Sequence, residues 1–192
     1  MTQIIVESGN TAQWQKLVHE AEALCEYQLD EELESYLVFL LIRFLDKADF
    51  TSRIMALDYL NSLVETGKLR ESKLREVGDH CLLFSGLFPK IAEKRRIKVS
   101  YYVSLGQSAY NDLATTCQLK LGDLYYQLAN SFVKLMDILQ TIGSMRDASN
   151  VLSPLQAFEL WSETRSQKAL DALKRSTSVI STPSLVHSSK KH

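Results

Sequence analysis

A chain of 192 residues with a net charge of −1 is long enough to bury a core without disulfides or a structural metal, and it lacks the basic excess of most nucleic-acid binders. Its 7 Gly and 3 Pro are too few for the many tight turns of a β-sandwich or barrel. Leu dominates the apolar residues, which favours helix over strand. The composition therefore predicts an all-α protein, and we expect a compact, single-domain bundle of six to seven helices.

The cysteines and the longest apolar run indicate in which cellular compartment the protein is expected. Cys25, Cys81 and Cys117 are odd in number, far apart and surrounded by apolar residues, as buried and reduced thiols would be. No C-x-x-C pair occurs, which removes the usual zinc and redox patterns. The N-terminus lacks the order of a signal peptide, and the apolar run 36–42 is too short to cross a bilayer. We expect a cytoplasmic protein with no membrane segment.

Charge is unevenly distributed along the chain. Residues 1–50 contain ten Asp and Glu against three Lys and Arg, whereas residues 51–100 contain six acids against ten bases. One acidic and one basic segment predict complementary surfaces, either within the fold or between copies.

The first two expected helices lie in the acidic segment. The first begins at Asn10 or Thr11, and its apolar residues recur at helical spacing as far as Cys25. Asp30 begins the second, whose first turn carries three glutamates that the helix dipole favours. Because residues 33–45 are apolar nearly all round, this second helix is expected to be central and buried.

A third helix is expected from Thr51 or Ser52 to a stop at Gly67. Its apolar residues recur at helical spacing and are Ile54, Leu57, Leu60, Leu63 and Val64. A fourth helix is expected from Ser72, followed by a short helical piece over residues 90–96.

Two further long helices are expected before the last one. A fifth covers residues 101–118, and a sixth has the clearest pattern of the chain. Its apolar residues alternate spacings of four and three, which predicts packing along its whole length against another helix: Leu121, Tyr125, Leu128, Phe132, Leu135, Leu139 and Ile142. This sixth helix, like the second, is expected to be central.

The last helix opens with a capping box, in which Ser153 and Gln156 flank Pro154 at the first helical position. Beyond it the composition changes to six Ser, two Thr, one Pro and a basic end. We therefore expect a helical bundle domain over residues 1–175 and a flexible Ser-rich tail over residues 176–192.

The middle of the chain resembles a known group of sequences. Residues 78–89 read GDHCLLFSGLFP, and residues 101–110 read YYVSLGQSAY. This series is similar to the L-x-x-S-G-x-F-P … Y-Y-x-x-x-G-x-x-A-Y core of a group of helical bacterial proteins of unknown activity. The resemblance implies a bacterial, cytoplasmic protein and supplies no activity.

The same residues have two physical interpretations. In the first they form a structural corner, because Gly86 permits a left-handed residue, Pro89 stops a helix, and Gly106 lets a neighbouring helix approach closely. In the second they line a ligand pocket made of His80, Ser85, Tyr102 and Tyr110. Both interpretations stay open at the level of the sequence.

Metal binding has weak support. Di-iron bundles use Glu-x-x-His pairs, and none occurs here. The nearest substitutes are His19 with Glu22 and Glu26, and Glu76 with Asp79 and His80. In each set one pair can share a helix face, His19 with Glu22 and Glu76 with His80. A metal site would require these two faces to meet.

The strongest charge feature is a basic patch of Lys94, Arg95, Arg96 and Lys98. Aromatic residues follow it directly, which would suit stacking and phosphate contact with a nucleic acid. A solvated helix end is the commoner explanation, so a nucleic-acid partner is not expected.

The function that these features favour is protein interaction. Several amphipathic helices and complementary charged segments are typical of an interaction module or homodimer. No nucleotide-binding loop and no nucleophile elbow occurs in the sequence. We expect a non-enzymatic interaction or regulatory protein that self-associates and needs no cofactor. The alternative is a bundle that binds a small ligand, metal or haem near His80 and Tyr102, which would allow an enzyme.

Overall fold

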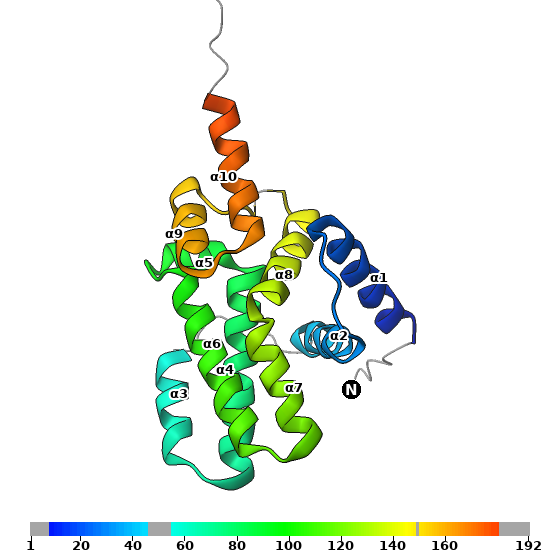
Figure 1. Ribbon diagram of the computed structural model, residues 1–192, viewed down its shortest axis with the longest axis vertical. Helices are drawn as coiled ribbons and strands as arrows, with labels where there is room; N and C mark the ends of the chain where they lie inside the picture. The colour runs from blue at the N-terminus through cyan, green and yellow to red at the C-terminus, as the bar shows by residue number, and fades with distance from the viewer. Residues whose placement is uncertain (1–7, 46–54, 149, 181–192) are drawn as a thin grey trace, which may run out of the picture.

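The computed structural model describes residues 8–45, 55–148 and 150–180, and within these ranges the regular structure is entirely α-helical (Figure 1). The expected cap at Thr51 or Ser52, Ile54 and the end of the predicted tail lie outside the described residues. The helices in chain order are α1 (Ser8–Cys25), α2 (Glu31–Leu45), α3 (Met55–Val64), α4 (Gly67–Leu87), α5 (Pro89–Lys94), α6 (Val99–Thr116), α7 (Leu119–Asn130), α8 (Phe132–Arg146), α9 (Pro154–Thr164) and α10 (Gln167–Ile180).

Ten helices in the described ranges exceed the expected six to seven, partly because two expected helices are each divided. The helix predicted over residues 121–142 is divided at Ser131 into α7 and α8. Backbone hydrogen bonds continue across this point, from Ser131 N to Gln127 O (2.8 Å) and from Leu135 N to Ser131 O (3.0 Å). The last expected helix is divided at Arg165, whose left-handed φ of 61° ends α9. Sequence periodicity did not reveal either division.

The centre of the bundle is α4. Residues 77–87 of α4 and residues 135–143 of α8 are all buried, and α4 packs against α6, α8 and α3. The expected central position of the sixth helix is therefore confirmed for α8. The second helix is less central than expected, because α2 buries one face and leaves Phe39 59% exposed.

Glycines set the close packing at this centre. A Cβ at Gly106 would lie 2.5 Å from Phe132 Cε2 and 2.9 Å from Cys81 Cβ, so α6 approaches α8 and α4 closely, as the small residues predicted. Gly86 has a different role from the expected one. It lies inside α4 without a left-handed φ and contacts Leu139, while Pro89 opens α5 as its first residue.

Two helical hairpins pack on this centre (Figure 1). The α1–α2 hairpin packs on α8 and α7, and the α9–α10 hairpin packs on α6 and α8. The predicted capping box opens α9, with Gln156 N donating to Ser153 Oγ (3.4 Å) and Ser153 N donating to Gln156 Oε1 (3.3 Å). Helix α10 extends beyond the other helices and continues to Ile180, past the predicted domain boundary at 175.

None of the helices in the described ranges is both long and apolar enough to cross a membrane.

Candidate functional site

A buried carboxylate joins three helices at the centre of the bundle. Asp79 on α4 accepts hydrogen bonds at Oδ1 from the hydroxyls of Tyr36 on α2 (2.6 Å) and Tyr110 on α6 (2.8 Å). Its Oδ2 accepts one from Arg43 Nη2 on α2 (3.1 Å). The charge of Asp79 is thus compensated by one cation and two hydroxyls, which is how proteins tolerate a buried carboxylate.

Burial controls the protonation of this cluster. It raises the pKa of Asp79 above its usual value, and the Arg43 guanidinium and the two hydroxyls oppose the rise without cancelling it. Burial and the Asp79 charge hold the pKa of Tyr36 and of Tyr110 well above the usual range. Both tyrosines therefore remain hydrogen-bond donors and are not candidate bases.

A cavity of about 140 Å³ lies beside Asp79, between α2 and α4. A buried water needs about 10–15 Å³ measured in this way, so the cavity could hold a small polar molecule. Arg43 Nε is buried without a hydrogen-bond partner in the described structure. The residues that line the cavity carry charges of both signs: Leu40, Arg43, Phe44, Ser72, Arg75, Glu76, Asp79, His80 and Leu83.

The structure separates the four residues of the predicted ligand pocket. His80 lines the cavity beside Asp79, and Tyr110 reaches Asp79 from α6. Ser85 Oγ donates to Cys81 O of its own helix (2.8 Å), so its hydroxyl is used locally. Tyr102 stacks on Phe84, with the ring centroids 5.5 Å apart. Neither Ser85 nor Tyr102 lines this cavity.

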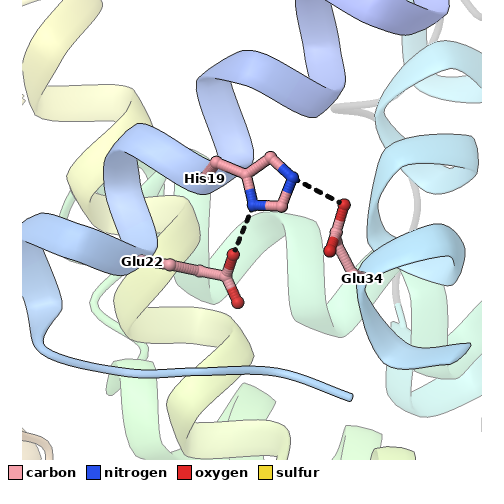
Figure 2. A group of neighbouring side chains, drawn as sticks. All are labelled: His19, Glu22 and Glu34. Atoms are coloured by element: carbon pink, nitrogen blue, oxygen red, sulfur yellow. Dashed lines mark hydrogen bonds and ion pairs between the residues drawn. The ribbon is translucent and has the colours of Figure 1, made fainter. Parts of the chain in front are cut away.

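The two predicted metal-binding pairs do not meet. Among the described residues, the one cluster of three or more metal-ligating side chains joins His19 and Glu22 of α1 with Glu34 of α2. Figure 2 shows the ring of His19 between the two carboxylates, with Nδ1 3.2 Å from Glu22 Oε2 and Nε2 3.3 Å from Glu34 Oε1. Glu76 and His80 lie on α4 and line the cavity beside Asp79.

Figure 2 shows His19 bridging two carboxylates. Each carboxylate faces a different nitrogen of His19, whereas one metal ion bound by all three side chains would use a single nitrogen. The other oxygen of Glu22 accepts a hydrogen bond from Leu29 N (2.7 Å), which fixes the turn between α1 and α2. The cluster therefore ties α1 to α2 as it stands.

Part of the predicted basic patch is engaged within the protein. Arg95 lies over the ring of Phe84, 5.4 Å from its centroid. Lys98 Nζ lies 2.7 Å from Glu163 Oε1, and this contact raises the pKa of Lys98. Lys94 and Arg96 are exposed, which leaves a smaller basic surface than the sequence suggested.

The sequence interpretation missed a second buried carboxylate. Asp137 of α8 accepts hydrogen bonds from Ser166 Oγ (2.6 Å), Gln167 N (3.0 Å) and Lys168 N (3.4 Å) at the start of α10, and from Tyr27 OH (3.2 Å). It thereby holds the N-terminus of α10 against α8. The available signal was an acidic residue inside an otherwise apolar run.

The cysteines carry no sign of reactivity. All three are free thiols, and burial raises the pKa of Cys25, Cys81 and Cys117 above the usual value. A raised pKa keeps a thiol protonated and weakly nucleophilic. Cysteine-based catalysis therefore has no support from this structure.

Comparisons with known proteins assign this chain to no family. No family model matches the chain, and neither a curated protein nor a solved structure is similar to it.

Proposed function

We propose that the protein is a cytoplasmic, non-enzymatic interaction protein that self-associates as a dimer through α3. The observation that carries this proposal is the orientation of α3, which leaves the side chains of Leu57, Leu60 and Val64 exposed. The free thiols support a reducing compartment. A bacterial source is part of this proposal and rests on the resemblance noted for residues 78–110 of the sequence.

Helix α3 exposes an apolar face and buries a polar residue. Leu57, Leu60 and Val64 share one face at spacings of three and four, and they are 53%, 59% and 81% exposed. Ser62 on the other side is completely buried, and its hydroxyl donates to Tyr59 O (2.5 Å). Burying a Leu or Val side chain contributes about 1.5–3 kcal/mol, so covering this face would release a substantial free energy.

Two further leucines of the α3–α4 hairpin are also exposed. Leu63 of α3 and Leu69 of α4 are 43% and 53% exposed. Apolar side chains that gather on one exposed face, as Leu57, Leu60 and Val64 do on α3, mark interaction sites more often than scattered ones do.

A second copy of the chain is the partner that the spacing favours. Leu60 lies near the middle between Leu57 and Val64, so the apolar side chains are spaced almost equally along α3 from either end. Antiparallel pairing of two α3 helices would place Leu57 of each copy against Val64 of the other. Such a contact is isologous and closes as a twofold dimer, the commonest symmetry of soluble oligomers.

Light scattering of the purified chain tests this proposal. We expect a mass near twice the 21.8 kDa of one chain, and a shift to a single-chain mass in Leu60→Glu with unchanged helicity. Leu155→Glu is the matched control, because Leu155 is 69% exposed on α9 and should not affect the dimer. A single-chain mass for the native protein, or a dimer that survives Leu60→Glu, would overturn the proposal.

A second candidate function is binding of a small polar ligand in the cavity beside Asp79. The unpartnered Nε of Arg43 favours it, because a buried donor without an acceptor is costly. Inorganic phosphate is a suitable first probe, since Arg75 also lines the cavity. This function requires that phosphate raise the thermal unfolding midpoint, and that Arg75→Met remove the rise.

A further inference from the structure

A second cavity lies where the α9–α10 hairpin meets the rest of the bundle. Its volume is about 220 Å³, larger than an engineered cavity of about 150 Å³ that binds benzene. The walls are mostly apolar and include Pro89 of α5, Val151, Leu152 and Pro154 near the start of α9, and Ala172 of α10. A hydrocarbon group larger than benzene therefore fits it.

One wall of this cavity is positively charged. Lys168, Ala172 and Arg175 line the cavity from one face of α10, at positions i, i+4 and i+7. Two cations thus flank a small apolar residue along a single helix face. An occupant that matches this wall carries negative charge at the edge of an apolar body.

The environment of Lys168 adds to this argument. The side chain is only partly exposed, and Nζ lies 3.4 Å from Ser144 Oγ. No carboxylate of the described residues forms an ion pair with Nζ within 4.0 Å, and the more distant charges of Asp137 and Asp171 compensate this cation only in part. Burial lowers the pKa of Lys168. A cation held out of water without a close counter-charge gains most from an anion.

The amides beside the cavity are already engaged. Gln140 Nε2 donates to Ser85 O (3.0 Å), and Asn150 Nδ2 donates to Leu87 O (2.8 Å). These bonds fix the cavity wall against the end of α4. They leave Lys168 as the cavity residue at which the proposed site can hold a negative charge.

We propose that this cavity binds a small apolar carboxylic acid, with the carboxylate at Lys168 and the hydrocarbon between Pro89, Leu152 and Ala172. Charge complementarity selects an acid over a neutral or basic apolar molecule. A charge-assisted hydrogen bond is roughly twice as strong as a neutral one. The proposal is independent of dimer formation through α3.

Calorimetric titration of the full chain with octanoate and with 1-octanol tests this site. We expect octanoate to bind at least about tenfold more tightly than octanol, which corresponds to ~1.4 kcal/mol. Lys168→Met keeps the apolar stem of the side chain and should reduce octanoate binding to the level of octanol. Lys174→Met is the matched control on an exposed part of α10 and should bind octanoate like the native chain.

Ala172→Phe fills the cavity and should abolish binding of both probes. Circular dichroism establishes whether each variant keeps the native helicity. If Lys168→Met unfolds, the affinities of the native chain for octanoate and octanol, together with the Ala172→Phe variant, still test the site. Equal affinity for the two probes, no binding of octanoate, or octanoate binding that survives Ala172→Phe would each overturn the proposal.

Discussion

The backbone of Gly78 lies directly against the ring of Tyr110: a Cβ added to Gly78 would stand 2.5 Å from Tyr110 Cε1. This contact brings α6 onto α4 and presents the Tyr110 hydroxyl to Asp79, the next residue along α4. Packing and hydrogen bonding at the centre of the bundle therefore depend on each other.

Gly78→Ala should destabilise the protein, although alanine favours helix over glycine by about 1 kcal/mol. Overpacking of a tight core costs roughly 1–3 kcal/mol, and the ring of Tyr110 is completely buried and cannot move aside freely. Urea unfolding measures the net change. Ser72→Ala is the control, because Ser72 is exposed on the same helix and should change stability by no more than about 0.5 kcal/mol. A more stable Gly78→Ala variant would contradict this explanation.

Asp79→Asn should change how stability depends on pH. The folded-state pKa of Asp79 is raised by burial, so its contribution is fully present below the unfolded pKa of about 3.9 and is lost as pH rises through the folded value. Each unit of the shift corresponds to about 1.4 kcal/mol. The native protein should therefore lose stability relative to Asp79→Asn as pH rises from about 4. Urea unfolding of both proteins over the acid range measures this difference, and a constant difference would refute the prediction.

The sequence predicted where the helices lie better than which of their faces are buried or exposed. Periodicity located α2 and α6, because apolar spacing reports directly on helical geometry. It found α4 but placed its start wrongly at Ser72, because Gly67, the expected stop of the third helix, is the first residue of α4. It could not show that Leu57, Leu60 and Val64 face solvent, since spacing identifies an apolar face without identifying what covers it. Apolar spacing also gave no signal of the turn at Ser131 or of the left-handed φ at Arg165.

The candidate site shows the same limit. The sequence singled out His80 and Tyr110, and both lie close to Asp79 or to the cavity beside it. It did not single out Asp79 as the shared acceptor, because Tyr36 and Tyr110 come from helices far apart in the chain. Long-range polar clusters of this kind require the fold before they can be recognised.

His19→Gln should leave the response of the protein to zinc unchanged. His19 bridges Glu22 and Glu34 through different ring nitrogens, an arrangement that stabilises the α1–α2 hairpin without a metal. An exposed pair of this type contributes about 0–1 kcal/mol, so the variant should be only slightly less stable. Thermal unfolding with and without excess zinc measures both effects. A zinc-induced rise in the midpoint that disappears in His19→Gln would instead establish a metal site.

Asp137→Ala should release α10 from the bundle. Removing this carboxylate leaves the Ser166 hydroxyl, the backbone N–H of Gln167 and the hydroxyl of Tyr27 without their acceptor. Hydrogen bonds to charged groups contribute about 1.5–3 kcal/mol each, and the losses are only partly additive. We expect a total cost of roughly 3–5 kcal/mol and faster hydrogen exchange at the first amides of α10 than elsewhere. Asp171→Ala is the control, since Asp171 is exposed on the same helix. Asp137 accepts hydrogen bonds from the start of α10, whereas Asp171 is exposed, so equal effects of the two substitutions would show that packing alone holds the N-terminus of α10.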